Sequence, residues 1–244
     1  MHHLGILAHS AEGAALCFRR FCQEGFRELG PHDHPDVTLD LVPLARSMPA
    51  WVAGDHRAVR EILAGSARRL AAAGAAFFVC PDNTAHLALE LPGEDLALPG
   101  LHLPDVVAAR AEREGYRRVG VLGTRYLMDG PVYPEAFARR GITAVVPGPE
   151  DRAMVDRVIF GELLDGVVRE ESRAAYARVI GELAERGCDA VALVCTEIPL
   201  LVTPGVSPLP TLDSPRLLAR AAFEVATGTA PMPCWRGGPP EPAS

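Results

Sequence analysis

Residues 70–86, LAAAGAAFFVCPDNTAH, combine a helix end, a glycine, a short apolar run and a cluster of polar side chains. Gly74 is the usual stop after a helix, and the apolar run that ends at Cys80 is typical of a buried strand. A second stretch at residues 183–199, LAERGCDAVALVCTEIP, has the same order of features. The two stretches indicate a duplicated unit in which a helix leads into a buried strand that ends in polar residues.

The alternation of strands and helices continues along the chain. Strands are expected in apolar or β-branched runs at residues 4–8, 37–44, 75–80, 118–124, 143–147 and 190–196. Helices are expected where apolar residues recur at three- and four-residue spacing, at residues 56–74, 104–115, 132–141 and 172–187. This pattern predicts an α/β fold of two similar lobes, each a parallel sheet flanked by helices.

The chain is expected to return to its first lobe near its end. We predict a first lobe from residues 1–102 plus 213–228, with the helical pattern in TLDSPRLLARAAFEVA as its last helix, and a second lobe from residues 103–212. Residues 229–244 are rich in Pro and Gly and have no periodic pattern. They are expected to form a flexible tail.

The amino-acid composition limits which classes of protein fit this sequence. The 244 residues are 48% hydrophobic and carry a net charge of -7, so we expect a well-formed core and no general attraction to nucleic acid. The sequence shows neither a membrane span nor a signal peptide. Six cysteines without a CxxC pair indicate reduced thiols, and we expect a cytoplasmic protein. Metal-ligand spacing and nucleotide-binding glycine motifs are absent from the sequence.

Polar side chains follow several of the expected strands. In parallel α/β sheets, ligands bind beyond the carboxyl ends of the strands, so these side chains are the candidate site residues. They are His9, Ser10, Arg46, Asp82, Asn83, Thr84, Thr124, Cys195, Thr196 and Glu197. With two similar lobes, we expect the active site in the cleft between them, with Asp82 and Cys195 on opposite sides.

Two of these strand ends lie within longer motifs. DNTAH at residues 82–86 and CTEIPLL at residues 195–201 are separated by GTRYLMDGPVY at 123–133 and VVPGPEDRAMVDRVIFGEL at 145–163. In this order the segments resemble the cofactor-independent aspartate/glutamate racemase superfamily, whose motifs read C-N-T-x-H and C-T-E-I-P-L-L. The resemblance extends over residues 4–227, nearly the whole chain.

The resemblance implies an isomerase, namely a racemase or epimerase of acidic or related amino acids that needs neither pyridoxal phosphate nor another cofactor. In the family, two cysteines remove and return the α-proton from opposite faces; the corresponding positions here are Asp82 and Cys195. We expect a small amino-acid or carboxylic-acid substrate, no nucleic-acid or membrane partner, and a homodimer. Substrate contacts are expected from His9, Ser10, Arg46, Asn83, Thr84, Thr124, Thr196 and Glu197.

Asp82 stands where the family has its first cysteine. A carboxyl with a pKa of about 3.9 is a poor proton donor at neutral pH, so we expect burial beside an anionic substrate to raise the pKa. Two other interpretations stay open: Asp82 contacts the substrate while Cys195 alone handles the α-proton, or Asp82 caps a helix that begins at Asn83. Aligning Cys80 with the family cysteine would restore a two-cysteine pair but would shift DNT out of register.

Three functions are therefore compatible with the sequence. The first is a two-base racemase that uses Asp82 and Cys195, whose two directions of reaction are chemically unequal because a carboxylate and a thiol differ as acids. The second is a one-sided decarboxylase, lyase or isomerase of a small carboxylic acid that depends on Cys195. The third is a non-catalytic ligand-binding homologue. The loop AHSAEGA at residues 8–14 departs most from the family and places His9 in the floor of the expected site.

Overall fold

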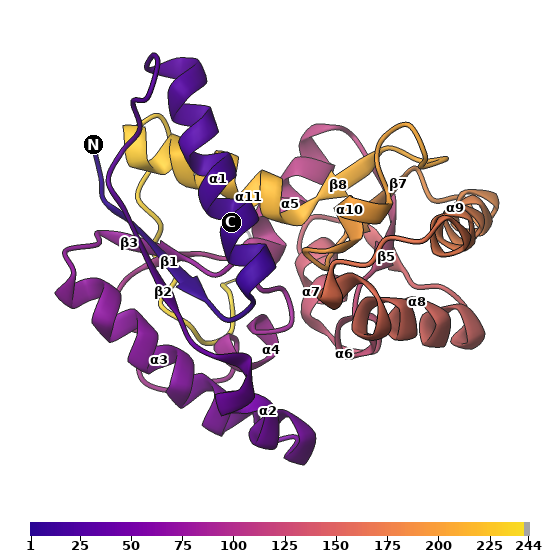
Figure 1. Ribbon diagram of the computed structural model, residues 1–244, viewed down its shortest axis with the longest axis horizontal. Coiled ribbons are helices and arrows are strands. Elements are labelled where there is room, and N and C mark those ends of the chain that lie inside the picture. The colour runs from indigo at the N-terminus through magenta and orange to yellow at the C-terminus, as the bar shows by residue number, and fades with distance from the viewer. Residues whose placement is uncertain (242–244) are drawn as a thin grey trace. The chain divides into compact units, whose positions relative to one another are not determined.

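The computed structural model describes residues 1–241 and divides into two compact units (Figure 1). Of the described residues, the first unit contains 1–103 and 215–241, and the second contains 104–214. Each unit is built on one four-stranded sheet. Within the described residues, no helix is both long enough and apolar enough to cross a lipid bilayer.

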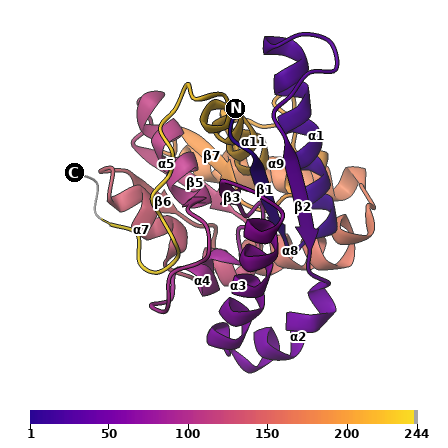
Figure 2. The ribbon, with the colours of Figure 1, turned by 90° about the vertical axis from the view of Figure 1, so that its left-hand side faces the viewer.

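The first unit has a parallel sheet in the order β2-β1-β3-β4. Its strands are β1 (Leu4–Ala8), β2 (Val37–Leu41), β3 (Phe77–Val79) and β4 (Gly100–Leu101). Its helices are α1 (Ala11–Glu28), α2 (Leu44–Ala53), α3 (His56–Ala72), α4 (His86–Leu89) and α11 (Ser214–Thr227). Every residue of β1 is buried, because α1 and α11 lie on one face of the sheet and α3 lies on the other (Figures 1 and 2).

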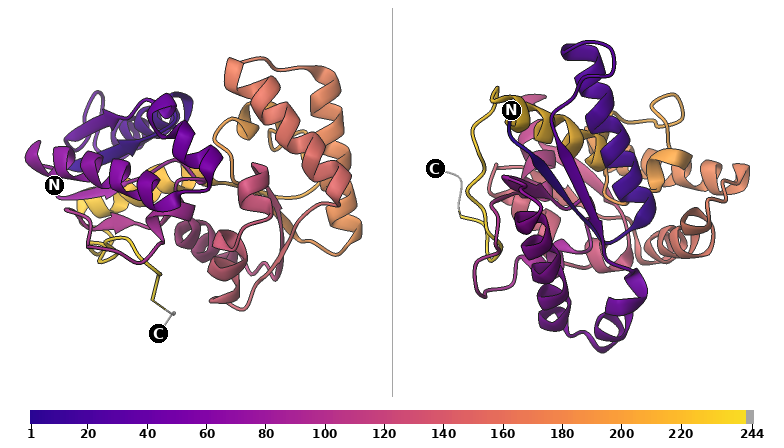
Figure 3. Two further views of the ribbon diagram at one scale, coloured as in Figure 1. Left: turned by 90° about the horizontal axis from the view of Figure 1, so that it is seen from below. Right: turned by 60° about the vertical axis from the view of Figure 1, so that its left-hand side comes forward.

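The second unit repeats this topology, with the strand order β6-β5-β7-β8. Its strands are β5 (Arg118–Leu122), β6 (Thr143–Val145), β7 (Ala190–Leu193) and β8 (Thr211–Asp213). Its helices are α5 (Leu103–Arg113), α6 (Arg125–Met128), α7 (Val132–Ala138), α8 (Pro149–Gly161), α9 (Glu170–Glu185) and α10 (Ile198–Leu201), with a 3-10 turn at Leu163–Asp165. Helices α8 and α9 pack side by side and share one apolar core with β5 and β7 (Figure 3).

The predicted α/β fold with two parallel sheets is confirmed, and the duplication extends to packing. In β1, a Cβ at Gly5 would lie 3.1 Å from a side-chain atom of Leu70, at the end of α3. In β5, a Cβ at Gly120 would lie 2.8 Å from Leu183, at the corresponding place in α9. Both leucines begin the repeated sequence stretches. Each glycine therefore leaves the space into which the helix before the third strand of its unit packs.

The strands are shorter than the sequence predicted at their carboxyl ends. The expected strand 75–80 is observed as β3 at Phe77–Val79, and the expected strand 190–196 is observed as β7 at Ala190–Leu193. The apolar runs therefore continue past the last ladder pairs into the loops that hold the candidate site residues. Strands β4 and β8 were not predicted, because two or three residues are too short to show a periodic pattern.

The segment expected to be a flexible tail makes defined contacts over residues 229–241, whereas residues 242–244 lie outside the described part of the chain. The backbone N–H of Gly100 donates to the carbonyl of Trp235 at 2.7 Å. The Trp235 ring stacks on His86, with ring centroids 5.9 Å apart, and meets the edge of His102 at 4.8 Å. Figure 2 shows this segment, in yellow, running past α4. One aromatic anchor orders a segment whose composition alone indicates disorder.

Replacing Trp235 with Ala tests this anchoring. The free energy of unfolding should fall by about 2 kcal/mol, because the variant loses the ring contacts with Phe78, His86 and His102 and part of the burial beneath them. Urea unfolding followed by circular dichroism measures the change. Met232→Ala, in the same segment at an exposed position, is the matched control and should stay within about 0.5 kcal/mol of the wild type. Equal stability of the Trp235 variant and the wild type would contradict the anchoring role.

Candidate active site

The register of two neighbouring strands brings His9 and Asp82 together. In the first unit, β1 pairs with β3 so that Leu4 lies opposite Phe77 and Ile6 lies opposite Val79. Continuing that register past both strand ends places His9 opposite Asp82, 73 residues away along the chain. The Nδ1 atom of His9 lies 3.0 Å from the Oδ2 atom of Asp82. The strand pairing therefore dictates this contact.

The Asp82 carboxylate is held at both oxygens. Oδ2 contacts the His9 ring, and Oδ1 accepts from the backbone N–H of Ala85 at 3.2 Å. The Asp82 side chain is 16% exposed, whereas His9 lies behind it and is only 1% exposed. One interpretation left open by the sequence was that Asp82 caps a helix beginning at Asn83, but residues 83–85 form a turn and α4 begins at His86. Asp82 caps that turn while keeping its other oxygen on His9.

The electrostatics of Asp82 differ from the expectation. Burial raises the pKa of its carboxyl, but the hydrogen bond and charge of His9, together with the Ala85 N–H, lower it by more, so the pKa lies below its usual value. Burial raises the pKa as the sequence led us to expect, but the sequence did not reveal the His9 contact that outweighs it. A lowered folded-state pKa means that the pair stabilises the fold above the unfolded carboxyl pKa. This stabilisation is lost as the pH falls through the lower folded value.

Ser47 completes the first set of contacts. It lies in α2, is fully buried, and places its Oγ atom 2.6 Å from Nε2 of His9 and 3.0 Å from the carbonyl oxygen of Leu44. Sequence reasoning selected its neighbour Arg46, which is exposed in the structure. A serine in the first turns of a helix carries no pattern that distinguishes it from a surface residue, so no sequence signal pointed to Ser47.

The polar residues after Asp82 hold the loop. Nδ1 of His86 lies 2.9 Å from the carbonyl oxygen of Asp82, and its Nε2 accepts from the backbone N–H of Leu103 at 3.3 Å. These two partners fix His86 as a neutral ring with its hydrogen on Nδ1. Asn83 is buried and Thr84 is partly exposed, both within the turn that follows β3. His86 therefore sets the position of the Asp82 backbone.

Cys195 occupies the corresponding place in the second unit. There β5 pairs with β7 so that Val119 lies opposite Ala190, and the same register continued places Thr124 opposite Cys195. The Cys195 Sγ atom donates to Oε2 of Glu197 at 3.0 Å. Cys195 is 8% exposed and Glu197 is 2% exposed. The thiol therefore has a buried carboxylate beside it that can take its proton when the thiolate forms.

The remaining predicted residues are distributed over both units. Thr196 donates from Oγ1 to the same Glu197 oxygen at 2.7 Å. Ser10 accepts from the backbone N–H of Gly13 at 3.3 Å and so caps α1. Thr124 is buried at the start of α6. The first unit thus brings together His9, Asp82 and Ser47, and the second brings together Cys195, Thr196 and Glu197.

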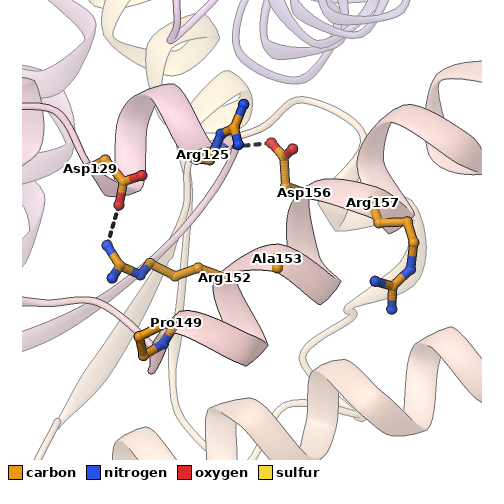
Figure 4. A pocket seen from close by; sticks show the side chains of 7 residues that line it. All are labelled: Arg125, Asp129, Pro149, Arg152, Ala153, Asp156 and Arg157. Carbon is orange, nitrogen blue, oxygen red and sulfur yellow. Dashed lines mark hydrogen bonds and ion pairs between the residues drawn. The ribbon is translucent and has the colours of Figure 1, made fainter.

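A surface pocket of about 420 Å³ in the second unit contains none of the predicted site residues (Figure 4). It is lined by Arg125, Asp129, Pro149, Arg152, Ala153, Asp156 and Arg157. Both of its carboxylates already have partners inside the pocket, since Arg152 pairs with Asp129 and the backbone N–H of Arg125 donates to Asp156. Among residues 1–241, no group of three His, Cys, Asp or Glu side chains is arranged to hold a metal ion.

Thiol reactivity tests the second set of contacts. Burial raises the pKa of Cys17 to about 12 and, together with the Asp82 carboxylate, raises the pKa of Cys80 further. Limited iodoacetamide treatment followed by peptide mapping should therefore label Cys195 before either of these. Glu197→Gln should slow the labelling of Cys195 several-fold, because an amide does not take the thiol proton, while exposed Cys234 reacts unchanged. Labelling of Cys80 as fast as Cys195 would contradict this account.

Comparison with known proteins places the chain in a family. The family model described as Asp/Glu/Hydantoin racemase matches residues 15–222. The broad specificity amino-acid racemase RacX of Bacillus subtilis (strain 168) is 21% identical over 201 residues, covering 82% of this chain and 86% of RacX.

Solved structures agree in fold. A putative Asp/Glu racemase from Yersinia pestis is 30% identical with a TM-score of 0.82, covering 93% of this chain and 100% of that one. PH1733, an aspartate racemase homologue from Pyrococcus horikoshii OT3, is 23% identical with a TM-score of 0.78, again covering 93% of this chain and 100% of that one. The family model extends over most of the sequence, and the chain belongs to the Asp/Glu/hydantoin racemase family.

Proposed function

We propose that the protein is an amino-acid racemase or epimerase, independent of pyridoxal phosphate, in which Asp82 and Cys195 transfer the α-proton on opposite faces of the substrate. The observation that carries the proposal is the equivalence of the two residues. Each follows the third strand of its unit, β3 or β7, and the strand register continued past the strand ends sets Asp82 opposite His9 and Cys195 opposite Thr124. Each also has a buried proton partner, His9 for Asp82 and Glu197 for Cys195.

The chemistry follows from the weak acidity of an amino acid's α-hydrogen. Removing it leaves an electron pair that the substrate carboxylate takes up as an enediolate, so the enzyme must stabilise negative charge on that group. Backbone N–H groups and the side chains of Asn83, Thr84, Thr124 and Thr196 are the proposed donors. Arg46 is proposed to pair with an acidic side chain of the substrate. Membership of the family supports an amino acid as substrate.

In one direction of the reaction, Asp82 acts as the base and Cys195 acts as the acid. Because the pKa of Asp82 is lowered, its carboxylate is ionised and ready to act as the base. The Cα–H bond breaks, the proton binds to Asp82, and the Cys195 S–H bond breaks as a new Cα–H bond forms on the other face. The sulfur is left as a thiolate beside Thr196 and Glu197.

One observation favours a second candidate function. A carboxylate with a lowered pKa is a weak proton donor, and a reaction in which Cys195 alone delivers the proton needs no return from Asp82. Such a reaction would be a one-sided decarboxylation, elimination or isomerisation of a small carboxylic acid. Asp82 would then bind the substrate rather than exchange its proton.

Action without a cofactor and a homodimer remain proposals from the family resemblance, and a cytoplasmic location remains a proposal from the pattern of cysteines. They affect how the protein is assayed but not the roles assigned to Asp82 and Cys195.

Racemisation by variants separates the two candidates. Purified protein is incubated with a panel of D- and L-amino acids, and the opposite enantiomer is measured by chiral chromatography. Asp82→Asn should lower racemisation by at least about 100-fold, because the amide cannot accept the α-proton, and Cys195→Ala should do the same. Asp33→Asn, at an exposed loop position, is the matched control and should racemise at the wild-type rate. If Asp82→Asn racemises at that rate as well, Asp82 does not transfer the α-proton and the two-base assignment is wrong. A wild-type protein that racemises none of the amino acids would favour the one-sided reaction.

A further inference from the structure

We propose that the proton-transferring group of the first unit is the pair His9–Asp82 rather than the Asp82 carboxylate alone, with His9 as a buried positioning residue that holds the transferable proton. The inference rests on the proposed function and deepens it. It removes the difficulty that a lone carboxylate takes a proton readily but gives one poorly. The positions of the hydrogens around His9 determine whether the pair can do this.

The hydroxyl of Ser47 determines whether the Nε2 atom of His9 carries a hydrogen. It has a single hydrogen, and the Leu44 carbonyl, 3.0 Å from its oxygen, can only accept. With that hydrogen given to Leu44, the Ser47 oxygen accepts from Nε2 of His9 across the short distance of 2.6 Å. His9 therefore carries a hydrogen on Nε2.

The second hydrogen lies between His9 and Asp82. The 3.0 Å distance from Nδ1 to Oδ2 is a hydrogen-bond distance, and two bare acceptors would repel each other there. With the hydrogen on Nδ1, the pair is an imidazolium and a carboxylate. With the hydrogen on Oδ2, the pair is a neutral imidazole and a carboxylic acid. One proton moved along this bond converts the first form into the second, and the pair has no net charge in either.

Three residues next to the pair, Trp51, His86 and Cys80, bring no charge to it. Across the His9 ring lies Trp51, with ring centroids 6.4 Å apart, which carries no charge. Next to the Asp82 backbone lies His86, which is neutral because its Nε2 accepts from Leu103. The neighbouring Cys80 thiol stays protonated, because burial raises its pKa. His9 is thus the partner with which Asp82 shares a proton.

The pair can act in both directions from one resting state. To take a proton, the substrate Cα–H bond breaks, its electron pair stays on the substrate, and the proton binds to Asp82 while His9 keeps both hydrogens. To give a proton, the His9 Nδ1–H bond breaks, the proton passes through Asp82, and a Cα–H bond forms on the substrate. His9 is then a neutral ring with its hydrogen on Nε2. Protons and charge balance in each step, and no co-reactant is required.

In the second unit, the partner of the proton-transfer residue comes from a different place in the chain. Thr124 holds the place in its register that His9 holds in the first unit, and the proton partner of Cys195 is Glu197, two residues further along the chain. Each unit therefore pairs a proton-transfer residue with a more deeply buried second group. The aspartate with a histidine behind it corresponds to the cysteine with a glutamate behind it.

Nitrogen NMR of the full-length protein labelled with ¹⁵N-histidine tests the pair without reference to activity. At neutral pH, the His9 Nε2 signal should lie in the range of protonated nitrogens, and its assignment comes from the loss of that signal in His9→Asn. His86 is the internal reference, with one protonated and one bare nitrogen. In Ser47→Ala, the His9 Nε2 signal should move to the range of unprotonated nitrogens, because the hydroxyl that accepts the Nε2 hydrogen is gone. An unprotonated Nε2 in the wild type would overturn the proposal. Ser47 would then donate to His9, and the His9–Asp82 pair would hold no proton to transfer.

Kinetics test the role of the shared proton. His9→Asn keeps an N–H donor toward Asp82 but cannot hold the extra proton. It should lower kcat at least about tenfold more for the enantiomer that requires Asp82 to give a proton than for the other. KM should fall in parallel, because the equilibrium constant between enantiomers stays at one. Equal losses of kcat in both directions would reduce His9 to a structural role. A wild-type protein that turns over no amino acid would overturn the proposed function, while the His9 spectrum would still decide the pair.

Discussion

The parallel pairing of the first and third strands in each unit determines which side chains meet where the chain leaves the sheet. Ladder hydrogen bonds between β1 and β3 fix the register of the two strands, with Leu4 opposite Phe77 and Ile6 opposite Val79. A shift of one residue would turn the side chains to the other face of the sheet. Gly5 and Gly120 support this arrangement, because they let the helix before the third strand pack closely against the first strand. His9 meets Asp82 as a consequence.

The duplicated scaffold carries two different chemical solutions at equivalent places. In the first unit, the register brings a histidine to the aspartate, and a serine from α2 closes the set from behind. In the second unit, the partner of the thiol comes from the same loop, where Glu197 accepts from both Cys195 and Thr196. The aspartate and the cysteine at equivalent places therefore have different hydrogen-bond partners.

Much of the fold followed from local patterns. Alternating apolar runs and helical periodicity predicted two parallel sheets, and the polar strand ends pointed to Asp82 and Cys195. The direction in which the Asp82 pKa shifts could not be predicted, because the shift depends on a histidine that is distant in sequence and is brought close only by strand pairing. Ser47 was missed because its role depends on the direction in which α2 leaves β2. The Trp235 anchor was missed because Pro- and Gly-rich composition says nothing about a single aromatic contact.

Deuterium transfer from solvent tests the central claim, proton exchange at a substrate α-carbon by two opposed groups, most directly. The wild-type protein is incubated in deuterium oxide with single enantiomers of amino acids, and each enantiomer is separated and weighed by mass spectrometry during the first turnovers. The account predicts that the newly formed opposite enantiomer carries one α-deuterium while the unreacted substrate keeps its protium, because the proton taken on one face is not the one returned on the other. Deuterium that enters the substrate without inversion, or inversion without deuterium, would contradict it.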